Sequence, residues 1–129
     1  MGTTLNEQVL DVSFTITDNA TETPDVVMQF KDSAGNDIDH PVAVMVYLST
    51  DAYGQTLAVD STDTSEIAIK TDGTILYEPA ADIMVYCVSE ADGDLGLTIT
   101  VITTRTVYVN VVMPNGEVKT CATALTYTA

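Results

Sequence analysis

The sequence predicts an all-β protein, arranged as an antiparallel sandwich or barrel. Thr, Val and Ile make up 45 of the 129 residues, and their branched Cβ atoms favour pleated strands over helices. Apolar and polar residues alternate along many short runs, and turn-forming residues separate these runs. Since no run spaces its apolar residues as a helix would, we expect about nine strands and no helix.

Three runs predict strands most clearly, because every second residue in them is apolar. They are residues 11–17 (DVSFTIT), 41–49 (PVAVMVYLS) and 106–113 (TVYVNVVM). Such alternation turns one face of a strand toward the core and the other toward water. Shorter runs predict further strands at residues 26–30, 65–70, 74–78, 83–89, 97–102 and 117–128.

The segments between these runs have the chemistry of turns. DSAGND (32–37), TDGT (71–74), EADGDLG (90–96) and MPNGE (113–117) place Asn, Asp or Pro close to Gly, which adopts positive φ without strain. We expect TDGT to form a tight hairpin between the strands that flank it. We expect MPNGE to form another, which joins the last two strands.

The charge is strongly negative, with 19 acidic residues against four Lys and Arg and a formal net charge of −15. A surface of this sign repels nucleic-acid phosphates and anionic lipids, so direct nucleic-acid binding and membrane binding are disfavoured. Residues 95–129 are an exception, because they hold one acid, Glu117, against Arg105 and Lys119. This neutral third predicts strands that lie inside the sheets; the alternative is a surface completed by a partner.

The length suits one domain, which we expect to span residues 9–129, with residues 1–8 as a polar N-terminal arm. The opening MGTTLNEQVLDV lacks the basic start and apolar core of a secretion signal. No apolar run approaches the length of a membrane helix. We therefore expect a protein made in the cytoplasm.

Two cysteines, Cys87 and Cys121, both fall in predicted strands. They could form a disulfide between two sheets or remain as two buried thiols. The lack of an export signal favours the thiols.

Catalytic chemistry finds little support in the sequence. His40 is the sole histidine, it precedes Pro41, and neither cysteine is near it in sequence. A Cys-His pair would also need a third, orienting group, which no motif marks. Since no glycine-rich phosphate loop follows a strand either, we expect a protein that is not an enzyme and binds no cofactor.

One acidic turn partly matches a calcium loop, since Glu90, Asp92 and Asp94 occupy alternate positions. Such a loop requires Gly at its sixth position and Glu at its twelfth, where this chain has Leu95 and Val101. A second group of acids, Asp32, Asp37 and Asp39, has no defined ligand spacing. Both groups are interpreted as ordinary acidic turns, and no metal is expected.

The longest predicted loop spans residues 50–64, with a short strand expected around residues 55–59. It follows PVAVMVYLS and contains the DAYGQ segment. The chain resembles the small immunoglobulin-like virion proteins of tailed bacteriophages in the order of its elements. These are a strand that ends in YLS, the DAYGQ loop, the DGT turn and a terminal hairpin at PNG. Such virion proteins are capsid decoration, cement or head-fibre proteins, and the resemblance covers roughly residues 8–127.

The resemblance implies an immunoglobulin-like antiparallel β-sandwich of about seven to nine strands. It also implies a non-enzymatic structural protein that binds the outer capsid surface of the virion and reinforces it. Its partners would be the major capsid protein and further copies of itself, most simply as a trimer.

Within that interpretation, the candidate contacts with the capsid or with another protomer are Asp51, Tyr53 and Gln55. Tyr53 would serve as the anchor, because aromatic residues are enriched in the cores of interfaces. The alternative for Tyr53 is local packing against its own loop. The alternative function is a host-surface or glycan-binding module on a virion fibre or tail.

Overall fold

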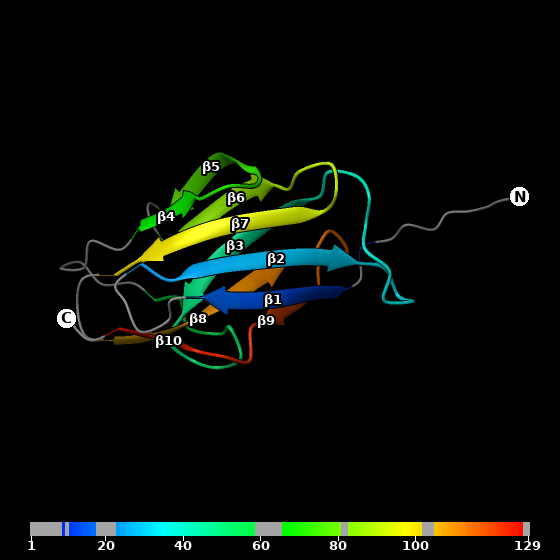
Figure 1. Cartoon of the computed structure of the whole chain (residues 1–129). Helices are drawn as coiled ribbons and strands as arrows, with labels where there is room; N and C mark the ends of the chain where they lie inside the picture. Colours follow the sequence, from blue (N-terminus) through cyan, green and yellow to red (C-terminus); the bar gives the residue numbers. More distant parts are fainter. Residues whose placement is uncertain are drawn as a thin grey trace, which may run out of the picture.

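A computed structural model describes residues 9, 11–17, 23–58, 66–80, 83–101 and 105–127. These residues form ten strands in two antiparallel sheets packed face to face (Figure 1), which confirms the all-β sandwich. The strands are β1 (Asp11–Thr17), β2 (Asp25–Lys31), β3 (Ala43–Ser49), β4 (Glu66–Ile69), β5 (Thr74–Ala80), β6 (Met84–Val88), β7 (Asp94–Thr100), β8 (Arg105–Val112), β9 (Val118–Thr120) and β10 (Leu125–Tyr127). No helix in this part of the chain has the length and hydropathy that a membrane crossing requires.

One sheet has four strands in the order β1-β2-β7-β4 and the other has six. In the six-stranded sheet the order is β10-β8-β3-β6-β5, with β9 also paired to β8. The chain passes between the sheets five times, from β2 to β3, β3 to β4, β4 to β5, β6 to β7 and β7 to β8. Connections between two packed sheets are typical of immunoglobulin-like sandwiches. Of the strands in the neutral third, β7 and β8 lie inside their sheets, as expected from their composition. The expectation is wrong for β9 and β10, which form an edge of the six-stranded sheet beside β8.

The strand count exceeds nine because the last predicted strand is divided. β9 pairs with residues 110–112 of β8, and β10 pairs with residues 105–107. Between them the amide of Cys121 still donates to the carbonyl oxygen of Val109, at 2.9 Å. The break over residues 121–124 therefore interrupts a single edge of the sheet.

The chain does turn at residues 71–74, but the prediction of a hairpin there is wrong. β4 pairs with β7 and β5 pairs with β6, so the chain changes sheets at this turn. Gly73 has a φ of +109°, and a Cβ there would lie 2.5 Å from Leu95 Cδ1. The turn is thus packed against the start of β7, a contact that the local sequence does not encode. The hairpin at residues 113–117 is confirmed, since Met113 and Glu117 are joined by a 2.7 Å backbone hydrogen bond.

The core lies between the sheets and is built from the inward residues of the alternating strands. Tyr127 of β10 spans it, donating from its hydroxyl to the carbonyl oxygen of Ile99 in β7 at 2.8 Å. Both cysteines are buried and free, which confirms the expectation of two buried thiols. Burial raises the pKa of Cys87 to about 12. The largest fully buried side chains are Tyr127, Phe30, Met28, Ile38, Leu48, Leu95, Leu97, Ile99, Met113 and Leu125.

Candidate functional site

The predicted contact residues lie in the loop that follows β3, and the structure describes this loop over residues 50–58. The carboxylate of Asp51 organises it, accepting hydrogen bonds from the backbone amides of Tyr53, Gln55 and Thr56 at 3.1, 2.9 and 2.8 Å. These bonds, led by the one from Thr56, lower the pKa of Asp51. Asp51 therefore fixes the backbone that presents Tyr53 and Gln55.

The expected short strand at residues 55–59 forms only as an isolated bridge. Leu57 is bridged to Ser49, and the amide of Ala58 donates to the carbonyl oxygen of Leu48 at 2.9 Å. Residue 59 lies outside the described residues. The loop thus returns along the end of β3 and is tied to it at its base.

The tip of the loop is fastened to the outer face of the six-stranded sheet. The hydroxyl of Tyr47 donates to the carbonyl oxygen of Gly54 at 2.6 Å. Gly54 has a φ of +71°, and a Cβ at this position would lie 2.5 Å from Asn110 Oδ1 and 2.8 Å from Tyr47 Oη. Only glycine fits this position without displacing its neighbours.

Beneath the tip lies a buried polar network centred on Asn110, whose exposure is 0%. Its Nδ2 donates to Ser49 Oγ at 2.9 Å and to the carbonyl oxygen of Tyr47 at 3.2 Å, while its Oδ1 accepts from Thr120 Oγ1 at 2.6 Å. Asn110, Ser49 and Tyr47 lie on the outward side of the sheet and are buried because the loop covers them. Burial, with the nearby charge of Asp51, raises the pKa of Tyr47.

Tyr53 stands on this anchored loop with 79% of its surface exposed. That exposure favours a contact with another molecule over local packing of the ring against its own loop. Gln55 is exposed as well. Neither residue takes part in the buried network below the loop, and both are available to another molecule.

A second feature is the outer face of the six-stranded sheet, which the sequence analysis did not identify. Its outward positions carry no charge along β3, β6, β8 and β9, whereas the outer face of the four-stranded sheet is polar and charged. The outward residues of these four strands are Ala43, Met45, Tyr47, Ser49, Met84, Tyr86, Val88, Thr106, Tyr108, Asn110, Val112, Val118 and Thr120. Those of the four-stranded sheet include Asp11, Ser13, Thr15, Asp25, Gln29, Lys31, Asp94, Thr98 and Lys70.

Five residues on this uncharged face form one line across five strands, which we name the apolar row. Successive strand pairs place Tyr77 beside Tyr86, Tyr86 beside Met45, Met45 beside Val112 and Val112 beside Val118. Tyr77, Tyr86 and Val118 are 66%, 37% and 43% exposed. The sequence signal was that β3 and β6 carry apolar residues at both inward and outward positions.

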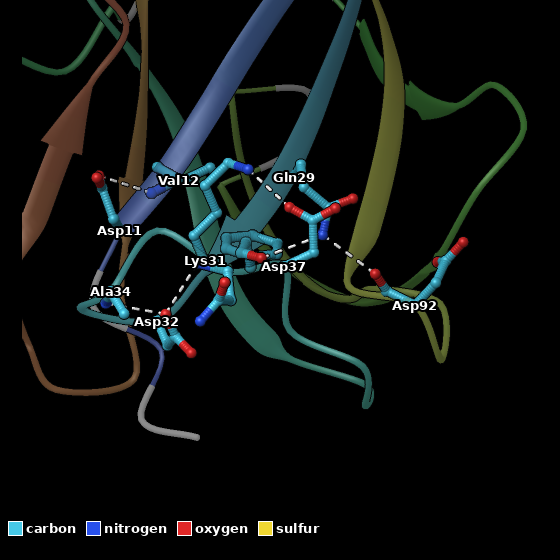
Figure 2. A network of polar contacts seen from close by, with 10 residues as sticks. Asp11, Val12, Gln29, Lys31, Asp32, Ala34, Asp37 and Asp92 are labelled. Atoms are coloured by element: carbon cyan, nitrogen blue, oxygen red, sulfur yellow. Dashed lines mark hydrogen bonds and ion pairs between the residues drawn. The ribbon is translucent and has the colours of Figure 1, made fainter. Parts of the chain in front are cut away.

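The acidic groups noted in the sequence lie at one end of the sandwich and serve its turns (Figure 2). Lys31 Nζ pairs with Asp37 Oδ1 at 2.6 Å. Asp32 accepts from the amides of Ala34 and Asn36, both at 2.9 Å. The hydrogen bond from the Asn36 amide is the largest cause of the lowered pKa of Asp32. Asp32 and Asp37 thus both take part in hydrogen bonds of the connection that follows β2.

The turn between β6 and β7 shows the same behaviour. The amide of Gly93 donates to the carbonyl oxygen of Glu90 at 3.0 Å. A hydrogen bond with Asp72 raises the pKa of Glu90, and burial followed by the charge of Asp92 raises that of Asp94. Among the described residues, no group of three or more His, Cys, Asp or Glu side chains is placed to hold a metal ion.

His40 lies at this same end, immediately before β3. It is half-buried, and its Nδ1 is 3.1 Å from the carbonyl oxygen of Pro41.

No protein-family model, no curated protein and no solved structure matches the chain. Its function is therefore inferred from the two surface features, the anchored loop and the apolar row.

Proposed function

We propose that this protein is a non-enzymatic structural protein of a bacteriophage virion, which binds the outer surface of the capsid and reinforces it. The observation that carries the proposal is Tyr53, 79% exposed on a loop held by Asp51, Gly54 and the Asn110 network. Exposed aromatic residues on rigid supports are the usual anchors of protein interfaces. The resemblance to capsid decoration proteins supplies the partner, the major capsid protein.

The rigid loop matters for affinity because binding then costs little conformational entropy. Asp51 and Gly54 have already fixed the backbone that carries Tyr53, so ordering of the loop does not oppose association. Tyr53 would insert into a pocket of the capsid protein, with the amide of Gln55 providing a polar contact at its rim. Asp51 contributes by holding the loop.

Reinforcement follows from mass action. A protein that binds the assembled shell and not its free subunits stabilises the shell by RT ln(1 + [L]/Kd) per site, about 2.7 kcal/mol when the free protein is at a hundred times Kd. Because a capsid repeats the same site many times, modest contacts add up over the whole shell. The acidic surface, with its net charge of −15, would also keep decorated particles apart.

Cryo-electron microscopy of cognate capsids mixed with the protein tests the proposal. We expect symmetry-related density outside the shell, and greater resistance of the decorated shell to heat and osmotic shock. Tyr53→Ala should weaken capsid binding at least about thirtyfold, the scale of an interface hot spot, whereas Tyr53→Phe should retain most of it. If Tyr53→Ala bound capsids as tightly as the unmodified protein, Tyr53 would be ruled out as the contact. If the shells remained bare at saturating protein, the capsid-binding role would be ruled out.

The alternative, a glycan-binding module on a fibre or tail, is favoured by one observation. Tyr77 and Tyr86 are cross-strand neighbours and both are exposed, so two aromatic side chains on which a sugar could stack come from adjacent strands. Binding of host-surface glycans by the isolated protein, abolished by Tyr86→Ala and unaffected by Tyr53→Ala, would support this alternative.

A further inference from the structure

In the described part of the chain the two sheets have four edges, and three of these edges carry features that oppose the addition of another strand. β5 has register shifts against β6 and contains Glu78 and Pro79. β4 has only four residues and begins with Glu66. The third edge is divided between β9 and β10, which have three residues each. Bulges, charges, proline and short strands are the usual means by which proteins protect sheet edges.

β1, which forms the fourth edge, lacks these features. It has seven residues and pairs with β2 in continuous register. Its only charged residue is Asp11, at one end, and it contains no Pro, Gly or Lys. Two of its apolar side chains, Phe14 and Ile16, pack against the core but are only partly buried. β1 therefore ends its sheet with an open edge and leaves the core beside it incompletely covered.

The register shows which backbone groups of β1 face the open edge. The amide of Phe30 in β2 donates to the carbonyl oxygen of Gly93 at 3.0 Å, so Phe30 directs its backbone groups away from β1. Val12 lies opposite Phe30, and the two residues therefore form a pair without mutual hydrogen bonds. By alternation, the amides and carbonyls of Val12, Phe14 and Ile16 all point away from β2 and toward the open edge.

Asp11 indicates the charge of a strand that would match this edge. Its Oδ1 accepts a hydrogen bond from the amide of Val12 at 2.8 Å (Figure 2), which places a carboxylate at one end of the edge. A strand with Lys or Arg beside this carboxylate gains an ion pair, whereas an acidic residue there is repelled. The net charge of −15 adds to this preference for a basic partner and opposes a second copy of the chain.

We propose that the open edge of β1 binds an extended segment of another protein, which adds to the four-stranded sheet as a further antiparallel strand. The segment alternates apolar residues with hydroxyl-bearing ones and carries Lys or Arg at its C-terminal end. Its apolar side chains extend the core beside Phe14 and Ile16. Its hydroxyl residues lie beside Ser13 and Thr15 on the outer face, and its basic end meets Asp11. The inference does not depend on the proposed capsid role.

Nuclear magnetic resonance of the full chain, titrated with a synthetic peptide, tests the proposal. The peptide has blocked ends and seven residues, to match β1, and alternates threonine with valine or isoleucine before a final lysine. We expect reversible binding with a dissociation constant of about 10 µM to 1 mM, and slower hydrogen exchange at the amides of Phe14 and Ile16. A peptide that ends in glutamate should bind at least about threefold more weakly, and about 0.5 M NaCl should narrow this difference.

A matched pair of variants at Phe14 separates backbone pairing from side-chain contact. Phe14→Pro removes the amide that faces the open edge and keeps the ladder with β2, because proline is tolerated on the free side of an edge strand. Phe14→Val removes the aromatic ring and keeps the amide. We expect Phe14→Pro to bind the lysine peptide at least about fivefold more weakly than Phe14→Val. Thermal unfolding checks that both variants are folded, and equal binding by the two would overturn the backbone pairing.

A second pair, Asp11→Asn and Asp39→Asn, measures the charge contribution without altering the backbone of β1. Each variant removes one exposed acid, from β1 or from the connection between β2 and β3. Asp11→Asn alone should weaken binding of the lysine peptide, by about two- to threefold, and equal effects would overturn the assignment of the basic end.

Three results would overturn the proposal as a whole. The first is no binding of the lysine peptide at about 1 mM. The second is a change in hydrogen exchange that is confined to another edge strand. The third is slower exchange at Phe14 and Ile16 when the protein alone is concentrated, because a second copy would then occupy the edge.

Discussion

Replacing Gly54 with alanine tests how the loop is fastened to the sheet. The substitution adds a single methyl group at a φ of +71°, where it would lie 2.5 Å from Asn110 Oδ1 and 2.8 Å from Tyr47 Oη. Contacts this short cannot be kept, so either the loop lifts or the two side chains move. In both cases the Tyr47–Gly54 hydrogen bond or the Asn110 network is disturbed.

The magnitude follows from two contributions. A residue with a Cβ in the left-handed region costs about 1–2 kcal/mol. Disturbing the hydrogen bonds of Asn110, which is fully buried, costs about 1–3 kcal/mol more, because its polar atoms lose partners without regaining water. We expect Gly54→Ala to lower the free energy of unfolding by about 2–5 kcal/mol.

The matched control is Gly35→Ala in the turn after β2. Gly35 has a similar φ of +84°, but an added Cβ would meet no atom within 4 Å, so this variant should show only the backbone cost of about 1–2 kcal/mol. Urea unfolding at equilibrium measures both variants, and their difference isolates the contact with Asn110 and Tyr47. If the two variants were equally destabilised, the loop would not be fastened in the way described.

Three further predictions concern titratable groups. Cys87 and Cys121 should react with a thiol reagent only after unfolding, because both are buried and free; recovery of a disulfide by mass spectrometry would contradict this. The pKa of Asp51 is lowered on folding, so its carboxylate should stabilise the fold at a pH above the unfolded pKa of about 4, and this stabilisation should be lost as the pH falls through the folded pKa. Asp51→Asn should flatten this part of the pH–stability curve. An unshifted pKa of Asp51 measured by NMR would refute its role in the loop. Lys70 Nζ lies 2.6 Å from Asp25 Oδ2, and this contact is the largest cause of the lowered pKa of Asp25. Lys70→Met should therefore raise that pKa, which NMR titration measures; an unchanged pKa would show that the lysine does not set it.

The sequence by itself determined the strands and their inward faces. Residues 11–17 alternate so regularly that β1 (Asp11–Thr17) matches the prediction at both ends. The hairpin at residues 113–117 and the burial of both cysteines followed in the same way. These features could be predicted because alternation, turn chemistry and hydrophobicity are properties of neighbouring residues.

Only the tertiary structure decided which strands are partners and which surfaces they create. The turn at residues 71–74 has the sequence of a hairpin, yet it carries the chain between sheets because β4 pairs with β7 and β5 with β6. The Asn110 network and the apolar row likewise join residues that are distant in the chain, brought together by strand register. Register depends on the packing of the whole core, so no local stretch of the sequence specifies it.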